Sequence, residues 1–404
     1  MKALWYGYVT GPILGVLWAF VVATAIAVLL SFSTGEAFRP GLWGSVAMGG
    51  LVGLAAPRNG ARWLLVLGAA VIGTALSYTG FGPIHVAQNV GVGGHVVAGA
   101  GFGVALAWPV SVMMAGCPRG ALDRHEWEGA VIRFLTGFGY IFFTAAVAIP
   151  FYVMVMTSLK TQGELIANPL DFSIDFSRGW GLFRSYEELF SDFNFGRYMW
   201  TSFYVSVLTV LITLLFSIPG AYAVARLRFR GQRALSRSIL LIYMVPMIVL
   251  ALPIYIAFSM TGLRNSILGI VMIYPVTTIP VALYMLQGYF RGLPAEIEEA
   301  GLMDGLNRLQ VIWKITLPLS LPALASVSLY VFMIAWNEFL LAFMLLDDPS
   351  KFTLTRGIAS LNSSEIPRQH LMAGAVIATV PVMALFLGLE KFMTRGLTAG
   401  SVKG

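Results

Sequence analysis

The sequence predicts an all-α polytopic membrane protein with about ten transmembrane helices. Of its 404 residues, 58% are hydrophobic and only 11% are charged, and the mean hydropathy is +0.79. A soluble domain usually carries about a quarter charged residues. The apolar residues also fall in runs close to the roughly 20 residues that a helix needs to cross the hydrocarbon core. These observations exclude an ordinary soluble domain and indicate a chain that crosses the membrane repeatedly.

Ten apolar runs are expected to be the spans. The first is too long for the apolar part of a cleavable signal peptide, so we interpret it as a retained span. The second and third runs are shorter than the others. The ten runs lie near residues 8–30, 41–56, 63–80, 93–116, 135–157, 200–225, 238–260, 267–289, 321–346 and 371–391.

The distribution of basic residues predicts the orientation of these spans. If the chain starts inside and crosses at every run, 17 of the 26 Lys and Arg residues fall inside. The densest group is RLRFRGQRALSR at residues 226–237, which contains five Arg and no acid. Cytoplasmic loops carry such an excess, and ten crossings satisfy it with both termini in the cytoplasm. The net charge of +7 therefore reflects membrane orientation and does not indicate a nucleic-acid partner.

A polar segment near residue 118 divides the chain. CPRGALDRHEWEGAVIRF separates four glycine-rich spans from six spans that are joined by more distinctive loops. We expect a four-helix membrane extension over residues 1–125 and a six-helix core over residues 126–404. Four crossings return the chain to the cytoplasm, so we expect the extension to lie beside the core and outside its pathway. Cys117 is the single cysteine, so no disulfide can form within the chain.

The loop at 290–320 carries charge between two apolar runs, in EEAGLMDGLNRLQVIWKITLPL at residues 298–319. Pro294 suits the first turn of a helix, and acidic residues after it suit the helix N-terminus. Gly305 is expected to end this helix. One face is small in its middle, which leaves room for a partner's backbone; it combines Ile297, Ala300, Gly301 and Asp304. A second amphipathic turn is expected to follow. The residues on one side of it are Leu306, Leu309, Ile312, Trp313 and Thr316.

Physical chemistry alone leaves two interpretations of this helix–turn–helix. The first is an amphipathic helix that lies on the membrane surface. An anionic cytoplasmic leaflet would repel its three acids, which weighs against that interpretation. The second is a docking surface for a cytosolic partner protein.

The same segment resembles the EAA loop of ABC-importer permeases, which has Glu-Ala-Ala, Asp-Gly and Ile-x-Leu-Pro at fixed spacing. Gly301 replaces the second Ala, and Ile312 stands where the family usually has Phe. The residues that match are Glu299, Ala300, Asp304, Gly305, Ile315, Leu317 and Pro318. Further stretches agree: TSLK at 157–160, AYAVARLRFRG at 221–231, WNEF at 336–339 and the C-terminal KFMTRGLTAGSVKG. Residues 130–404 therefore resemble the maltose-type (MalG-like) sugar permeases.

This resemblance implies that the EAA loop carries a coupling helix that fits a cleft on a cytosolic ATPase subunit. It implies ATPase-coupling roles for Glu298, Glu299, Ala300, Gly301, Asp304 and Gly305. ATP and Mg would then bind to partner ATPase subunits, and no cofactor is expected in this chain. The sequence agrees, because it contains no G-x-x-x-x-G-K-[ST] phosphate loop and neither a nucleophile–base pair nor a clustered metal site.

The resemblance also implies the rest of the assembly: a second permease subunit, two ATPase subunits, and an extracytoplasmic binding protein that delivers a sugar. The expected location is a bacterial or archaeal cytoplasmic membrane. Two loops on the predicted outside, 158–199 and 346–370, are longer than a simple connection requires. We expect both loops to contact the binding protein.

Possible pathway residues are fewer. Glu338 is an acid in an apolar run, and intramembrane acids are functional candidates. It lies about 20 residues past Pro318, which places it about 30 Å along a helix and near the outer surface, where water would solvate it. Trp336 and Asn337 are its neighbours, and Tyr243, Tyr255 and Tyr274 are aromatic candidates. Packed or lipid-facing positions explain the tyrosines equally well.

The sequence thus predicts the permease subunit of an ATP-driven sugar or oligosaccharide importer, which is not itself an enzyme. An importer of the same type for a polyol, glycerol phosphate or another non-sugar solute is the first alternative. An ion-coupled secondary transporter is the second, and it would require midspan acids or inverted repeats. A membrane anchor or sensor is the third. Copurification with an ATPase separates the importers from the last two.

Overall fold

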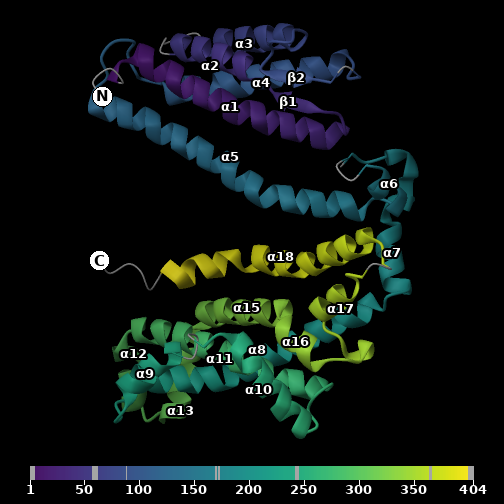
Figure 1. The fold of residues 1–404 in the computed structure, drawn as a ribbon. Coiled ribbons are helices and arrows are strands. Elements are labelled where there is room, and N and C mark those ends of the chain that lie inside the picture. Colours follow the sequence, from purple (N-terminus) through teal and green to yellow (C-terminus); the bar gives the residue numbers. More distant parts are fainter. Residues whose placement is uncertain are drawn as a thin grey trace. The chain divides into compact units, whose positions relative to one another are not determined.

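The computed structural model describes residues 5–56, 62–87, 89–168, 171, 173–241, 245–363 and 366–398 (Figure 1). The chain forms two compact units, Met1–Leu182 and Phe183–Gly404. The first unit includes the first helix of the expected core together with the extension. The boundary expected near residue 125 separates an added module from that core, and it stays a prediction.

Two helix–strand–helix hairpins build the N-terminal part of the first unit. Their elements are α1 (Gly7–Thr34), β1 (Phe38–Pro40), α2 (Leu42–Ala55), α3 (Arg62–Ser77), β2 (Ile84–Val86) and α4 (Val92–Met113). The strands pair antiparallel, with Arg39 opposite His85. The apolar pattern of the sequence predicted the helices, but it gave no sign of these three-residue strands. The pairing joins the two hairpins at one end, since it links the loop after α1 to the loop after α3.

Glycines allow the helices of each hairpin to pack at backbone contact. A Cβ on Gly53 would lie 2.1 Å from the carbonyl oxygen of Gly11, and a Cβ on Gly11 would lie 2.3 Å from that of Gly53. In the second hairpin, a Cβ on Gly103 would lie 2.3 Å from the carbonyl oxygen of Ala69. Helices in lipid associate largely through such close van der Waals packing, because lipid tails remove the hydrophobic driving force. The glycines of these hairpins therefore serve tight packing.

Helix α5 (Arg124–Ser158) packs against this extension. Near its start, the Arg133 guanidinium donates to three carbonyl oxygens at the C-terminal end of α4, at 2.8 to 3.3 Å. The Trp18 ring meets the Phe134 ring edge to face, 6.1 Å between centroids. Towards its other end, the Tyr152 hydroxyl donates to the Phe32 carbonyl at 3.2 Å, and the two rings stack. The extension is therefore anchored at both ends of the first core helix.

The polar segment before α5 is held in place by the chain's own N-terminal residues. The Leu122 N–H donates to the Trp5 carbonyl at 2.7 Å, and Tyr6 forms a bridge with Ala121. Asp123 and Glu126 form a capping box that begins α5. Cys117 is buried here, and burial raises the pKa of its thiol. This segment is consequently part of the packed extension.

The second unit is a helical bundle around α8, α11, α15 and α18, which supply most of its buried apolar residues. Two shorter helices follow α5 in the loop before this unit: α6 (Gln162–Ala167) and η2 (Phe176–Phe183). The second unit's elements are α7 (Arg184–Ser191), α8 (Phe195–Arg226), α9 (Gln232–Leu241), α10 (Met247–Met260), α11 (Ile267–Gly292), α12 (Ala295–Met303), α13 (Arg308–Val311), η4 (Ile312–Thr316), α14 (Leu317–Leu319), α15 (Leu321–Asn337), α16 (Leu340–Leu345), η5 (Pro349–Lys351), α17 (Leu354–Ser360) and α18 (Arg368–Thr398).

All ten expected runs contain helix, and the polytopic all-α class is confirmed. Within the described residues, six helices are long and apolar enough to span alone: α1, α4, α5, α8, α11 and α18. A bent pair, Arg308–Leu319 with Leu321–Asn337, forms a seventh candidate. Helices α2, α3 and α10 are apolar but only 14 to 16 residues long. The number of ten crossings therefore stays a prediction.

The close packing of α1 on α2 leads to a paired test. Gly53→Ala would push a methyl group into the Gly11 backbone, and overpacking of this kind costs about 1–3 kcal/mol. Gly50→Ala on the same helix meets nothing within 4 Å, so the purified protein should keep its stability. Thermal unfolding in detergent measures both. Equal melting temperatures for the two variants would contradict the packing described here.

Candidate functional site

Helix α12 lies in the EAA loop and has well-defined ends. Pro294 precedes it in an extended conformation, and two acids occupy its first turn. At the other end, Gly305 adopts a left-handed backbone with φ +86°. The Gly305 N–H donates to Leu302 O, and the Leu306 N–H donates to Gly301 O, both at 3.1 Å. This is the Schellman arrangement that satisfies the last carbonyls of a helix, and it confirms the predicted stop.

The chain then turns at once into a second helical segment. Asn307 and Gln310 form a reciprocal capping box at 2.9 Å, which begins α13. The helix widens to a π-helix over Ile312–Thr316, where the Leu317 N–H donates to Ile312 O. An 80° bend after Leu319 then leads into α15. The predicted helix–turn–helix is thus present, and its second helix is joined to a bundle helix through a sharp bend.

Glu298 connects α12 to the bundle. Its side chain is buried and its Oε1 lies 3.4 Å from Arg226 Nε, at the last turn of α8. The Tyr222 hydroxyl donates to Oε2 at 3.2 Å, and the Thr316 hydroxyl donates to Oε1 at 3.0 Å. Arg226 also donates to the Leu293 carbonyl at 2.7 Å, just before α12. These contacts form the Glu298 cluster: Glu298, Arg226, Tyr222 and Thr316.

The Glu298 cluster fixes where α12 sits on the bundle. One carboxylate accepts bonds from α8 and from η4, so it holds three separate segments together. A buried pair of this kind requires good geometry and further hydrogen bonds to offset its desolvation. The hydrogen-bond requirement is met by two hydroxyls that donate to the carboxylate, whereas Arg226 Nε lies 3.4 Å from Oε1 and forms no hydrogen bond with any described residue. Glu298 therefore faces inward, and a positioning role suits its place better than direct contact with another protein.

Gly301 also faces inward. A Cβ at this position would lie 2.5 Å from Ile315 Cδ1, so the space beside the glycine is filled by the chain's own second helical segment. The small middle of α12 was expected to admit a partner's backbone. Gly301 instead closes the turn between α12 and η4, whereas Ala300, the other small residue of that face, is exposed.

The outward face of α12 and its neighbours is mixed acidic and apolar. Glu299, Ala300, Asp304 and Gly305 are exposed. Large apolar side chains accompany them on the same loop; the most exposed are Met303 at 87%, Trp313 at 72% and Leu309 at 69%. Exposed apolar groups rimmed by charge mark interaction surfaces. We call this set the outward EAA surface; it consists of Glu299, Ala300, Met303, Asp304, Gly305, Leu309 and Trp313.

The π-helix explains one departure from the expected pattern. Leu309, Ile312, Trp313 and Thr316 were placed on one side by counting 3.6 residues per turn. In the structure Thr316 is fully buried in the Glu298 cluster, whereas Leu309 and Trp313 are exposed. A π-turn inserts an extra residue into the helix, which changes the phase of everything after it.

The candidate pathway residues at the end of α15 form packing and capping contacts. The buried Trp336 indole donates to the Ala378 carbonyl in α18 at 3.1 Å. Asn337 is exposed, and its amide donates to its own helix. The Glu338 carboxylate accepts the backbone N–H groups of Leu341 at 3.0 Å and Ala342 at 3.2 Å, so it caps α16. This local role accounts for the acid without a solute.

Of the tyrosine candidates, one lies on a different helix and one is buried within the bundle. Tyr255 is on α10, with the Arg264 guanidinium 4.8 Å above its ring. The Tyr274 hydroxyl is fully buried beside Glu338 and Thr353. Tyr243 lies outside the described residues. A pathway role for Trp336, Asn337, Glu338 and Tyr255 stays a prediction.

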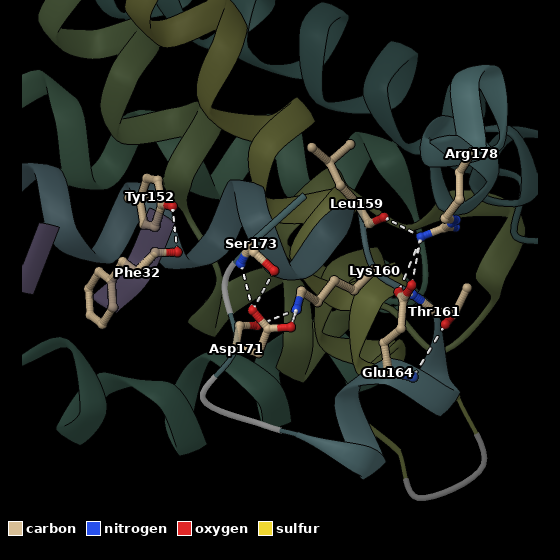
Figure 2. A network of polar contacts seen from close by, with 9 residues as sticks. All are labelled: Phe32, Tyr152, Leu159, Lys160, Thr161, Glu164, Asp171, Ser173 and Arg178. Atoms are coloured by element: carbon tan, nitrogen blue, oxygen red, sulfur yellow. Dashed lines mark hydrogen bonds and ion pairs between the residues drawn. The ribbon is translucent and has the colours of Figure 1, made fainter. Parts of the chain in front are cut away.

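The loop 158–199, which is expected outside, is organised around ion pairs and hydrogen bonds, as Figure 2 shows. Lys160 is buried; its Nζ lies 3.1 Å from Asp171 Oδ2 and also donates to the Asp171 carbonyl. Arg178 donates to the Leu159 carbonyl at 3.1 Å and pairs with Glu164 at 3.2 Å. Burial opposes ionisation of Asp171, but hydrogen bonds from Ser173 and Lys160 lower the pKa of its carboxyl. This part of the loop is therefore folded onto the end of α5.

The loop 346–370, which is also expected outside, is held by hydrogen bonds to the bundle. The Leu354 N–H donates to Ser202 Oγ at 2.7 Å, and the Thr355 hydroxyl donates to the Glu338 carbonyl at 2.6 Å. His370 Nε2 lies 2.6 Å from a carboxylate oxygen of Glu188 in α7. Hydrogen bonds from Arg184 and His370 hold the pKa of Glu188 below its ordinary value. Hydrogen bonds and ion pairs thus hold the described residues of both loops in a folded arrangement.

Sequence reasoning missed the inner half of the site. Arg226 and Tyr222 precede Glu298 by more than 70 residues, and nothing local in AYAVARLRFRG signals their contact. Thr316 was recognised only as part of an amphipathic turn. The one signal in the sequence was Glu298 itself, an acid directly before the Glu-Ala-Gly match. The acids of one helix need not all face the same way, so Glu298 could face away from the others.

Comparisons with known proteins agree on one family. Residues 217–398, which include the EAA loop, match the family model described as Binding-protein-dependent transport system inner membrane component. The chain is 37% identical to the inner membrane ABC transporter permease protein YcjP of Escherichia coli over 66% of this chain and 95% of YcjP. It is 32% identical to the trehalose/maltose transport system permease protein MalG of Thermococcus litoralis, over 69% and 99%.

A solved structure is similar as well. It is that of a bacterial ABC transporter involved in the import of the acidic polysaccharide alginate, with a TM-score of 0.54 and 25% sequence identity. The match covers 67% of this chain and 98% of that chain. About a third of this chain therefore lies outside the match.

Two adjacent glutamates of α12, Glu298 and Glu299, provide a stability test. Glu298→Ala would leave the Arg226 guanidinium buried without its partner, and breaking a buried pair from one side costs about 3–5 kcal/mol. Glu299→Ala removes an exposed acid from the next position, and exposed substitutions usually stay within about 0.5 kcal/mol. We expect a lower melting temperature in detergent for Glu298→Ala alone. A Glu298→Ala protein as stable as Glu299→Ala would contradict the cluster.

Proposed function

The chain belongs to the family of binding-protein-dependent transport system inner membrane components, and from this premise we propose that it is the membrane-spanning permease subunit of an ATP-driven importer for a sugar or oligosaccharide. The observation that carries the proposal is the outward EAA surface. It combines exposed acids with exposed apolar groups, and the buried Glu298 cluster fixes it to α8, a helix of the bundle. The names of the similar permeases support a sugar as solute.

Coupling is the central part of this function. ATP hydrolysis takes place on separate cytosolic ATPase subunits, which hold ATP and Mg, and this chain contributes no catalytic group. The outward EAA surface, centred on Glu299, Asp304 and Gly305, docks on an ATPase subunit. Movement of that subunit is transmitted through α12 and the Glu298 cluster to α8, and through the bend after Leu319 to α15. The chain then alternates between inward-facing and outward-facing states.

The other partners follow from the remaining surfaces. A second, related permease completes the pathway. An extracytoplasmic binding protein delivers the sugar to the two loops 158–199 and 346–370. The folded arrangement of these loops supports this role. Both termini and the EAA loop lie in the cytoplasm, as the excess of basic residues on that side favours. Residues 1–125 form a peripheral extension, and their glycine-packed hairpins support a role in assembly.

Charge reversal on the outward EAA surface tests coupling. Glu299→Lys or Asp304→Lys should keep the chain in the membrane but reduce copurification of ATPase subunits and sugar-stimulated ATP hydrolysis by at least about tenfold. Either substitution places a cation where the docking surface carries an acid, and like or mismatched charges at an interface cost several kcal/mol.

Glu187→Lys is the matched control. It reverses the charge of an exposed acid on α7, which the proposed orientation places on the side of the membrane opposite the EAA loop. It should leave ATPase copurification unchanged. Wild-type copurification and stimulated uptake in both EAA variants would show that this surface does not couple the chain to an ATPase.

A further inference from the structure

A basic cavity lies between α9 and the end of α11. Its volume is about 310 Å³, and it is lined by Gln232, Arg233, Ser236, Arg237 and Arg291. Three of these five side chains are guanidinium groups and none is a carboxylate. The arginines come from two elements, since Arg233 and Arg237 are one turn apart on α9 and Arg291 is in the last turn of α11. We call this the arginine pocket.

The positive charge of the arginine pocket is uncompensated. Within the described part of the chain, Arg233, Arg237 and Arg291 form no ion pair with a carboxylate, whereas Arg226 nearby is paired with Glu298. The preceding residues add Arg228 and Arg230, again without an acid. Several guanidinium groups around one cavity repel one another unless an anion lies between them. A bound anion would therefore offset the repulsion between the arginines of the pocket.

Part of the pocket is held in place before anything binds. Gln287 is buried on α11 and bonds to Ser236 of α9 at 2.8 Å. With the amide oxygen turned inward, it accepts from both terminal nitrogens of Arg291 at 3.1 and 3.0 Å. Gln232 donates to the Val224 carbonyl at 2.7 Å, which ties the start of α9 to α8. Three lining residues, Gln232, Ser236 and Arg291, are therefore held in place, while the side chains of Arg233 and Arg237 are exposed.

The surroundings of the pocket are apolar. Leu235 and Leu241 on α9 are 48% and 57% exposed, and Phe229 before the helix is 42% exposed. Ile239 on α9 is buried, so the helix packs on the bundle by another side. A short helix with basic residues on one face and apolar residues beside them is typical of the membrane interface. An occupant with a negative head and apolar chains would satisfy both parts of this surface.

We propose that the arginine pocket binds the phosphate group of an anionic phospholipid in the cytoplasmic leaflet. The leaflet follows from the proposed orientation, which places the end of α11 and the EAA loop on the cytoplasmic side. Guanidinium groups bind phosphate oxygens through paired, charge-assisted hydrogen bonds. Basic pockets between membrane helices on this side hold such headgroups. The bound lipid would hold α9 against the end of α11. Only Gly292 separates the pocket residue Arg291 from the segment that leads into α12.

The test titrates the full-length chain in neutral detergent with dioleoylphosphatidylglycerol or dioleoylphosphatidylcholine and counts bound lipid by native mass spectrometry. The wild-type chain should prefer the anionic lipid. Arg233→Gln/Arg237→Gln should weaken phosphatidylglycerol binding by at least about tenfold, since it removes two of the three guanidinium groups that line the pocket and would donate to the phosphate oxygens.

Arg228→Gln/Arg230→Gln is the matched control. It removes the same charge from the same loop, at exposed residues that do not line the pocket. It should leave phosphatidylglycerol binding nearly unchanged, and both double variants should melt like the wild type because none of the four arginines is buried. This comparison separates a defined site from the general excess of positive charge on the cytoplasmic side.

Four outcomes would overturn the proposal. Equal losses in the two double variants would mean diffuse attraction. Equal binding of the two lipids by the wild type would mean no headgroup selection. Displacement of phosphatidylglycerol by inorganic phosphate in millimolar excess would assign the pocket to a soluble anion. Unchanged lipid binding together with loss of ATPase copurification in Arg233→Gln/Arg237→Gln would assign the arginines to a protein contact. None of these results depends on which sugar, if any, the chain transports.

Discussion

The buried carboxylate of Glu298 is the contact on which the position of the outward EAA surface depends. A short helix outside the bundle has little apolar surface to bury, and α12 by itself would be only marginally ordered. Glu298 joins it to Arg226 and Tyr222 at the end of α8 and to Thr316 in the following π-helix. Because an unpaired buried charge is costly, these groups stay together or separate as a unit. An α12 fixed in this way can transmit force, whereas a loosely tethered helix cannot.

The same arrangement gives neighbouring glutamates different roles. Glu298 is buried and positions the helix, while Glu299 is exposed on the face proposed to meet the ATPase. Gly301 and Gly305 likewise serve the loop's own geometry, one by admitting Ile315 and the other by taking a left-handed backbone. A motif that resemblance treats as one coupling element therefore divides into residues that shape the helix and residues that present a surface. Arg291 and the arginine pocket lie just before that helix, at the end of α11.

Local chemistry in the sequence predicted much of this structure, and long-range contacts did not follow from it. Apolar runs located a helix in each of the ten expected regions, and Gly305 correctly marked the end of α12. The β1–β2 pairing was missed because three-residue strands carry no periodic signal. The partners of Glu298 were missed because they lie far away in the chain, and the orientation of Thr316 was missed because a π-turn breaks the 3.6-residue period. Glu338 was recognised as unusual, but its capping role depends on a bend after Asn337 that no sequence rule placed there.

The central claim is that the Glu298 cluster holds the outward EAA surface in the position where an ATPase subunit docks. A single cysteine at Met303, which is 87% exposed, tests it in a Cys117→Ser background by disulfide crosslinking to cysteines in the ATPase cleft of the assembled complex. The account predicts a strong, specific crosslink when residue 298 is Glu, and a weak or scattered one in the Glu298→Ala background at equal amounts of assembled complex. Equal crosslinking in both backgrounds, or no crosslink in any nucleotide state, would contradict it.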